Sequence, residues 1–386
     1  MTPERGHVLI PAHTRGSLRP VRLMGATFRR RRRLVAVAIV CLAAAAAGLG
    51  AIAARGGSIS CIPVATPHET GQRTIAEVFA ASGGKVYVRT TGSQLVAVDG
   101  VPVGWRKGHF LAPGRLLDAL PGHGHEVIYA GDDALYRSGN GGQSWERLGC
   151  GHVLDGVAVA ARQPNLIYLA ADVLDGPPQG VGGGLYRTRD GGRTWSHLSV
   201  FPREDATVQA VAINPRSTND VTVALADGGV ARSLDGGHHW SFSTMGFKLT
   251  GPSGAGLRGP QVWNLAYGAA PAHTLWAGSQ QGVFRRGRNG MWTKVLRSGY
   301  AADLTVVPDA RLPRLAFAVG GPAPKVARRT VDGGKTWRPL PGLPTDIQGI
   351  SIRQSDDTVY AWTSHRIYQS SDHGTTWTRL PRLPRR

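Results

Sequence analysis

The stretch from Thr188 to Trp195, TRDGGRTW, decides the fold because similar stretches return along the chain. Five further copies end at Trp145, Trp240, Trp292, Trp337 and Trp377. TVDGGKTW and SSDHGTTW keep the whole pattern of hydroxyl residue, aspartate, glycine, threonine and tryptophan. SLDGGHHW loses one position, SGNGGQSW has Asn140 in place of the acid, and RRGRNGMW keeps only the turn glycine and the tryptophan. Such recurrence indicates an internal repeat.

The spacing of the copies gives the size of the repeating unit. Successive tryptophans lie 50, 45, 52, 45 and 40 residues apart, which is the length of one four-stranded propeller blade. Trp105 lies 40 residues before Trp145 and follows KVYVRT and QLVAVD, so we expect a seventh unit without the motif. The sequence therefore predicts an all-β, seven-bladed β-propeller, with six or eight blades as the alternatives.

Each unit contains four short runs that are typical of β-strands. In one unit these runs are TVQAVAIN, VTVALAD, GVARSLD and HWSFST. Polar and apolar residues alternate in them and β-branched residues are frequent, which favours strands. We expect an inner strand, two further strands, the motif turn and an outer strand that begins at the tryptophan, with no helix in the propeller.

The motif contains the residues that a tight turn between two strands requires. Its glycines adopt positive φ at little steric cost. The aspartate accepts hydrogen bonds from the amides of the turn, and the tryptophan packs a large ring against the preceding sheet. We therefore expect a structural role for Asn140, Trp145, Asp190, Trp195, Asp235, Trp240, Asp332, Trp337, Asp372 and Trp377.

The pattern Ser/Thr-x-Asp-x-Gly-x-Thr-Trp resembles the Asp-box, also called the bacterial neuraminidase repeat. Asp-box propellers include sialidases, sortilin-type receptor ectodomains, xyloglucan-cleaving glycosidases and the photosystem II assembly and stability factor. The resemblance covers about residues 74 to 380 and implies the propeller fold. It leaves the activity open, because the same box occurs in enzymes, receptors and assembly factors.

The enzymes among these relatives carry signatures that this chain lacks. A sialidase requires an arginine cluster, a tyrosine nucleophile and an acid/base aspartate, and the family's Phe/Tyr-Arg-Ile-Pro motif is missing here. The xyloglucan-type enzymes close a cleft between two propellers, and this chain has one. We therefore expect no catalytic residue and a non-enzymatic module that binds a protein or peptide. The alternative is a sialidase-like glycoside hydrolase that acts on extracellular glycans, with acids drawn from Asp118, Asp155 or Asp303.

A ligand site is expected on the face opposite the boxes. The two longest insertions, which begin at Asp172 and Met245, lie on that face together with the starts of the inner strands. A polar ring at the mouth of a channel is typical of a ligand or ion site, although such residues also satisfy backbone groups and water. The candidate residues are Asp118, Asp155, Gln209, Trp263, Asn264, Asp303 and Gln348.

The N-terminal region predicts a membrane anchor. Residues 34–54 are 21 uncharged, mostly apolar residues, long enough to cross a bilayer as a helix. They follow the cluster Arg29 to Arg33, so residues 1–33 are expected in the cytoplasm, 55–73 as an extracytoplasmic stalk, and the propeller, 74–386, outside the cytoplasm. The alternative is a cleaved signal with Ala51 and Ala53 at the cleavage site, which would give a secreted form.

The formal net charge of +20 indicates either an acidic partner or an arginine-rich composition. We expect no nucleic-acid partner, because no dense basic run is interleaved with aromatic residues. Arginines nonetheless recur at equivalent places in the third strands and could form a positive stripe on one face: Arg137, Arg187, Arg232 and Arg285.

Few residues suggest metal or redox chemistry. Cys61 and Cys150 would face an oxidising compartment, where they form either a disulfide or two free thiols. His123, His125 and Glu126 have the spacing of two ligands on one side of a strand but lack a third. We therefore expect no metal and no cofactor.

Overall fold

The structure is a computed structural model that describes residues 74–80, 85–90, 95–99, 114–119, 127–131, 134–140, 144–175, 184–200, 207–226, 228–247, 259–269, 274–297, 305–320, 326–353 and 356–382. These residues form strands, turns and bends without a helix, and all of them belong to one compact unit, Gly57–Arg386. The expected tail, anchor and stalk lie outside the described residues. Within the described ranges, no helix is long and apolar enough to cross a membrane.

The described strands form six sheets, and within each sheet every strand pairs with its neighbours in the chain. The first sheet consists of β1 (Ile75–Ala80), β2 (Lys85–Thr90) and β3 (Leu95–Asp99). The second, with seven strands, consists of β4 (Gly114–Ala119), β5 (Val127–Gly131), β6 (Ala134–Ser138), β7 (Glu146–Ala160), β8 (Gln163–Asp175), β9 (Gly184–Thr188) and β10 (Ser196–Leu198).

The other four sheets have four strands each. They are β11 (Val208–Asn214), β12 (Ser217–Leu225), β13 (Val230–Ser233) and β14 (Ser241–Phe242); then β15 (Val262–Tyr267), β16 (Leu275–Ser279), β17 (Gly282–Arg286) and β18 (Trp292–Arg297). They continue with β19 (Thr305–Pro308), β20 (Ala316–Gly320), β21 (Val326–Thr330) and β22 (Arg338–Pro339); then β23 (Gly349–Arg353), β24 (Thr358–Trp362), β25 (Ile367–Ser370) and β26 (Thr378–Arg379).

The strand β7 differs from the expected pattern. We expected a separate outer strand after Trp145 and a new inner strand near residue 153, but both belong to one strand of 15 residues. The start of β7 pairs with β6, whereas its whole second half pairs with β8. Two four-stranded units are thereby joined into one sheet.

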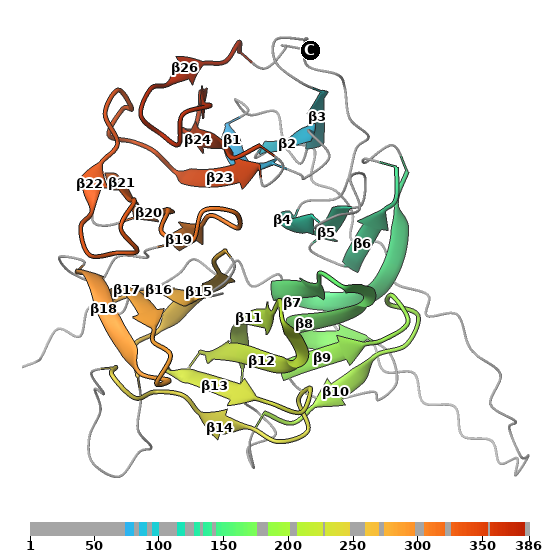
Figure 1. Cartoon of the computed structure of the whole chain (residues 1–386). Coiled ribbons are helices and arrows are strands. Elements are labelled where there is room, and N and C mark those ends of the chain that lie inside the picture. Colours follow the sequence, from blue (N-terminus) through green and yellow to red (C-terminus); the bar gives the residue numbers. More distant parts are fainter. Residues whose placement is uncertain are drawn as a thin grey trace, which may run out of the picture. The chain divides into compact units, whose positions relative to one another are not determined.

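The sheets follow one another around a ring (Figure 1). The inner strand of each unit contacts the next, in the order β1, β4, β7, β11, β15, β19 and β23. The strand β23 contacts β1 again, and Val78 and Val88 of the first sheet share a buried cluster with Tyr360 and Trp362 of the last. The first and last sheets therefore close the ring without a covalent link.

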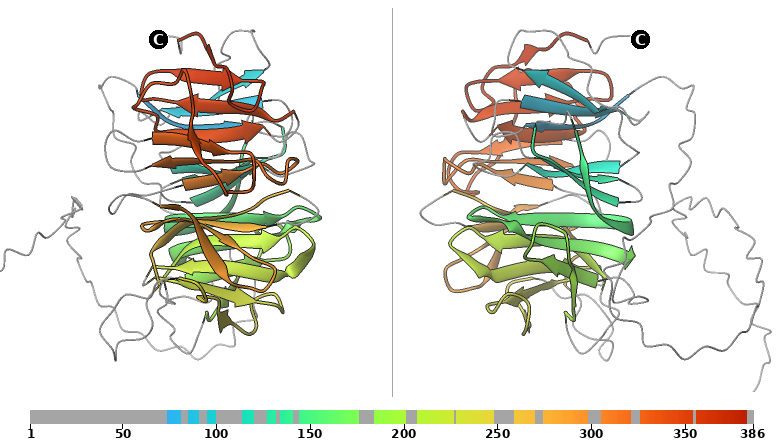
Figure 2. Two further views of the ribbon diagram at one scale, coloured as in Figure 1. Left: turned by 60° about the vertical axis from the view of Figure 1, so that its left-hand side comes forward. Right: turned by 90° about the vertical axis from the view of Figure 1, so that its right-hand side faces the viewer.

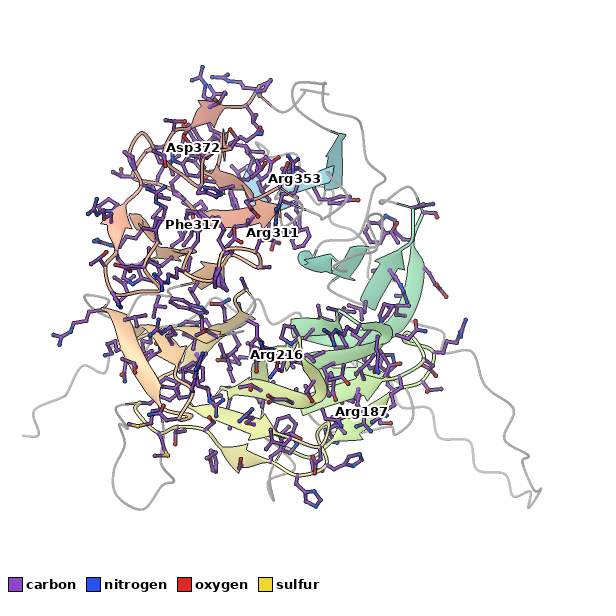
Figure 3. All side chains as sticks on the ribbon, viewed as in Figure 1. Arg187, Arg216, Arg311, Phe317, Arg353 and Asp372 are labelled. Carbon is purple, nitrogen blue, oxygen red and sulfur yellow. The ribbon has the colours of Figure 1, made fainter. Side chains whose placement is uncertain are left out.

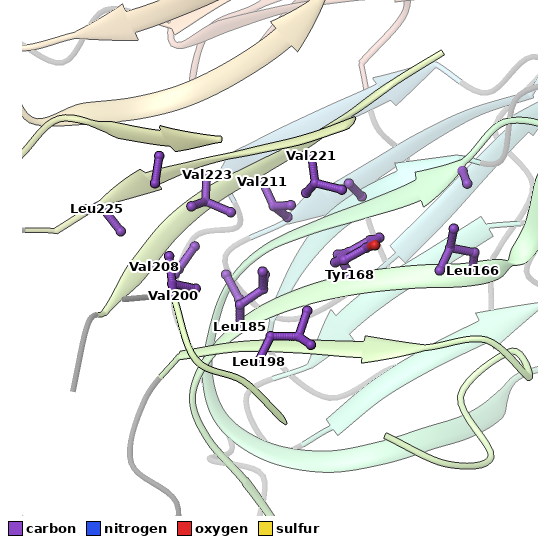
Figure 4. Close-up of a cluster of buried hydrophobic side chains, with 14 residues drawn as sticks. Leu166, Tyr168, Leu185, Leu198, Val200, Val208, Val211, Val221, Val223 and Leu225 are labelled. Atoms are coloured by element: carbon purple, nitrogen blue, oxygen red, sulfur yellow. The ribbon is translucent and has the colours of Figure 1, made fainter. Parts of the chain in front are cut away.

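Neighbouring sheets lie face to face (Figure 2), and apolar side chains fill the space between them. Between the sheet of β8 and the sheet of β11, one cluster contains Tyr168, Leu185, Val211 and Val223, all of them buried (Figure 4). The β-branched and leucine side chains fill the space between two pleated surfaces. The apolar core is therefore distributed between the sheets, as expected for repeated layers.

The turns of the repeated motif share one hydrogen-bond pattern. Thr188 donates its hydroxyl hydrogen to Asp190 Oδ1 at 2.7 Å and accepts from the amide of Gly192 at 2.9 Å. The amide and the hydroxyl of Thr194 both donate to the carboxylate of Asp190, at 2.9 and 2.6 Å. Equivalent bonds occur around Asp235, Asp332 and Asp372, and Asn140 accepts from the amide of Ser144 at 2.9 Å. These contacts confirm the turn chemistry expected for the motif.

The second glycine of the motif is required for both conformation and space. Gly192 has a φ of 100°, and a Cβ there would lie 2.7 Å from Leu148 Cβ in the preceding unit. At the first glycine position, His373 adopts a φ of 57° in one copy. A side chain is therefore tolerated at the first position but not where the turn touches the neighbouring sheet.

Three arginines of the third strands tie their sheets to the turn of the next sheet. Arg187 donates from Nη1 to the carbonyl of Gly236 at 2.6 Å. The equivalent bonds run from Arg285 to the carbonyl of Gly333 and from Arg329 to the carbonyl of His373. These guanidinium groups hold neighbouring units together. We had expected the third-strand arginines only as a positive stripe on one face and had not predicted this role.

We predict that the protein loses stability in acid, because the motif carboxylates accept their hydrogen bonds in the ionised form. Burial disfavours the ionised form of Asp190, but bonds from Thr194 and Thr188 outweigh it and lower its pKa to about 2. Because the unfolded chain holds an ordinary aspartate, with a pKa of about 3.9, this stabilisation is present above about pH 4 and is lost as the pH falls to about 2. Asp190→Asn should keep the turn, as Asn140 does, and reduce the proton uptake on unfolding in this range by up to one proton. The proton uptake is obtained from the pH dependence of the free energy of unfolding, measured with urea between pH 5 and 2. Asp346→Asn, at an exposed position outside the motif, is the control. An unchanged pH slope in Asp190→Asn would contradict the assignment.

Candidate functional site

The structure brings part of the predicted polar ring together. Gln209 lies in β11, and Trp263 and Asn264 lie in β15, each near the start of its inner strand. Gln348 directly precedes β23. Asp118 lies in β4 and Asp155 in β7, but their side chains are outside the described set, as is the whole of Asp303.

A β-bulge recurs near the start of the inner strands. Val208 pairs with Leu225 and Ala210 with Ala224, which leaves Gln209 as the extra residue. The same shift of register leaves Trp263 extra in β15 and Asp155 extra in β7. Bulges re-aim side chains and are frequent beside functional sites. The register therefore places Gln209 and Trp263 at equivalent, specialised positions of two strands that contact each other.

Gln209 and Trp263 keep unused hydrogen-bonding capacity. Gln209 Oε1 and Trp263 Nε1 are both buried, and neither has a hydrogen-bond partner among the described residues. A buried polar atom without a partner costs about 1–3 kcal/mol, so most such atoms in proteins find one. An acceptor and a donor on neighbouring strands, unpaired and closed to solvent until the side chains around them move, suit a ligand that offers hydroxyl groups.

The other described members of the ring are already occupied. The Asn264 amide donates to the carbonyl of Val306 at 3.1 Å, and the amide of Val306 donates to Asn264 Oδ1 at 2.9 Å. Asn264 therefore links β15 to β19. Gln348 is exposed and donates to the carbonyl of Asp346 at 3.0 Å. These contacts give both side chains a role within the fold.

A hollow opens near the end of β11 that lies away from Gln209. A cavity of about 350 Å³ lies between β13 and β17 and is lined by Asn214, Asp220, Arg232, Tyr267, Thr274, Leu275, Arg285, Arg286, Gly287 and Arg288. We did not predict it, although the sequence carries a signal. Arg285 is equivalent to Arg187, because both donate to a carbonyl in the turn of the next sheet. Counted from these arginines, Arg286 and Arg288 stand where TRDGGRTW has its hydroxyl residue and its acid, and the turn that ends at Trp292 is one residue shorter.

The spacing of buried residues would also have revealed the bulges. Val208 and Val211 belong to one cluster, and so do Val262 and Leu265. In a regular strand, residues that share a face are two or four apart, so a separation of three requires an extra residue between them.

The structure holds no metal-type cluster of three or more His, Cys, Asp or Glu among the residues that it describes. Cys61 and the pair His123 and His125 lie outside those residues, and only the backbone of Cys150 is described. The disulfide between Cys61 and Cys150 therefore stays a prediction.

Comparisons with known proteins point to glycoside hydrolases. No protein-family model matches the chain. The chain is 26% identical to a xyloglucanase of a Paenibacillus species over 250 residues, 61% of this chain and 21% of that protein. It is 24% identical to a xyloglucanase of Hypocrea jecorina over 265 residues, 62% of this chain and 28% of that protein. The chain thus spans about a quarter of the length of these curated relatives.

A solved relative has the same fold. The GH74 xyloglucanase from Xanthomonas campestris matches with a TM-score of 0.60 at 16% identity, over 79% of this chain and 53% of that chain. At this identity the match shows the fold, and the fold of this chain is a β-propeller.

The expectation of a non-enzymatic, protein-binding module is wrong, because these relatives are xyloglucanases. The error has a simple source. The missing Phe/Tyr-Arg-Ile-Pro motif excludes sialidases, but it says nothing about hydrolases that bind a neutral glycan.

Proposed function

We propose that this chain is a propeller glycoside hydrolase that acts on an extracellular glycan of the xyloglucan type. The observation that carries the proposal is the pair of open hydrogen-bonding atoms, Gln209 Oε1 and Trp263 Nε1, at matching bulges. A sugar hydroxyl can accept from the indole N–H while another donates to the amide oxygen. Both side chains are neutral, which suits a neutral glycan better than sialic acid.

The catalytic acids would come from Asp118, Asp155 or Asp303. Glycoside hydrolases of most families use two carboxyl groups that flank the scissile bond. Asp155 is the extra residue of the bulge in β7, the position that Gln209 and Trp263 occupy in the next two inner strands. We therefore assign Asp155 as one of the two acids.

We also propose seven blades with Asp-box turns. The support is the continuous series of contacts from β1 to β23 and back, with β7 shared by two units. The N-terminal segment, 34–54, would hold the propeller at the outer surface of the membrane.

The test is hydrolysis of xyloglucan by the full chain purified in detergent. We expect release of reducing ends, a loss of at least about 100-fold in kcat for Asp155→Asn, and a rise of about tenfold or more in KM for Trp263→Ala. The acid acts in the chemical step, whereas the indole acts in binding, so the two variants separate kcat from KM.

Gln209→Ala should likewise raise KM, because the amide oxygen acts in binding. Gln163→Ala is its matched control, because Gln163 is an exposed glutamine at the start of β8. It should leave both constants unchanged. If neither xyloglucan nor mixed-linkage β-glucan is cleaved, the proposal is overturned.

A further inference from the structure

The hairpin between β17 and β18 carries the one motif copy that reverses the charge of the box. In the five other copies the first residue is a buried Ser or Thr, exposed by 2% or less: Ser138, Thr188, Ser233, Thr330 and Ser370. Here that residue is Arg286, and the acid two positions later is replaced by Arg288. A neutral hydroxyl and a carboxylate thus become two guanidinium groups.

The altered hairpin also changes the arginine that faces it from the preceding sheet. Arg187, labelled in Figure 3, and Arg285 each donate to a carbonyl in the turn of the next sheet. Arg232, at the same place in β13, instead forms two bonds of 2.6 Å with Asp220. Asn214 donates a third bond to that carboxylate at 2.7 Å. The carboxylate of Asp220 is therefore engaged by its own sheet.

The cavity between β13 and β17 has an excess of positive charge. Its lining holds Arg232, Arg285, Arg286 and Arg288 against one carboxylate, that of Asp220, which gives a formal charge of +3. Burial, and then the neighbouring Arg232, lower the pKa of Arg286. Burial, and then the carboxylate of Asp220, raise the pKa of Tyr267 to about 12, so its hydroxyl stays a neutral donor.

Arg286 has a buried donor that the described residues do not use. Its Nε is buried and has no hydrogen-bond partner among them. Arg286 as a whole is half-buried, and a guanidinium group with a buried, unpaired donor is costly unless an anion completes the site. The volume, about 350 Å³, lies within the range of small-molecule sites, so the cavity admits more than a single ion.

We propose that this cavity binds an oxyanion group, a carboxylate or a phosphate, carried by a small organic ligand such as a uronic acid or a sugar phosphate. Guanidinium groups bind both oxyanions through paired, charge-assisted hydrogen bonds. Arg286 and Arg288 hold the oxyanion, and Tyr267 donates to the rest of the ligand. Asn214 and Gln209 lie near opposite ends of β11, so this site is separate from the proposed glycan site and does not depend on it.

The test is isothermal titration of the full chain with inorganic phosphate, glucuronate and glucose, at constant ionic strength set with chloride. We expect saturable binding of phosphate or glucuronate and none of glucose. If only phosphate binds, the ligand of this cavity carries a phosphate group. If only glucuronate binds, the ligand carries a carboxylate.

Two substitutions assign the binding to the cavity. Arg286→Ser and Arg288→Asp restore the residue types of the intact box, so the hairpin should still fold, and each should weaken binding at least about tenfold. Arg193→Gln, which removes an exposed arginine from the intact box of TRDGGRTW, should leave binding unchanged. Absence of saturable oxyanion binding, or binding unaffected by Arg286→Ser, would overturn the proposal.

Discussion

Phe317→Ala should lower the free energy of unfolding by about 3 to 5 kcal/mol, the range for removing a buried phenylalanine side chain. Phe317 lies in β20, is fully buried, and belongs to a cluster that joins the last two sheets (Figure 3). A Cβ on Gly374, in the turn that carries Asp372, would lie 3.0 Å from Phe317 Cε1. Phe317 therefore supports a motif turn of the next sheet as well as filling the core.

Urea unfolding followed by tryptophan fluorescence measures this effect. Phe242→Ala is the matched control, because Phe242 is 59% exposed and its replacement should change stability by less than about 0.5 kcal/mol. A loss of less than about 1 kcal/mol in Phe317→Ala would mean that the two sheets collapse into the cavity, and would contradict the tight packing described above.

Asp220→Ala should lower the free energy of unfolding by about 3 kcal/mol, near the lower end of the range for breaking a buried ion pair. Asp220 is only 5% exposed, whereas a quarter of the Arg232 side chain reaches solvent. The substitution leaves Arg232 unpaired beside Arg286 and Arg288. Repulsion among these groups adds to the loss of the three hydrogen bonds that Asp220 accepts.

The double variant Asp220→Asn with Arg232→Gln separates these contributions. It removes both charges and should lose less stability than Asp220→Ala, because no unpaired guanidinium group of Arg232 remains. Equal losses in the two proteins, measured by the same unfolding experiment, would show that the unpaired charge is not the cause.

The fold was predictable because one short turn motif, with the strands around it, recurs along the chain. The run TVQAVAIN became β11, and the stretch VTVALAD became the end of β12, as their alternation predicted. The turn chemistry around Asp190 followed from the spacing of Thr188, Asp190 and Gly192. Each of these features depends on residues close together in the chain.

The site was less predictable because it depends on neighbours far apart in the chain. Asn264 and Gln209 look alike as polar residues of inner strands, but Asn264 is bound to Val306 in the next sheet, while Gln209 Oε1 has no partner among the described residues. Sequence spacing does not reveal that difference. The activity was missed for another reason, because the scaffold motif is shared by proteins of different function.

The long strand β7 has a consequence for how this propeller opens. Its backbone hydrogen bonds belong to the units on both sides, and Cys150 pairs with Ala134 in one direction and with Asp175 in the other. Separating those units requires the two ladders to break together, so they form one cooperative block. The remaining sheets are joined by connections outside any ladder and can fray singly, which makes the block of β4 to β10 the last part of the ring to exchange its amide hydrogens.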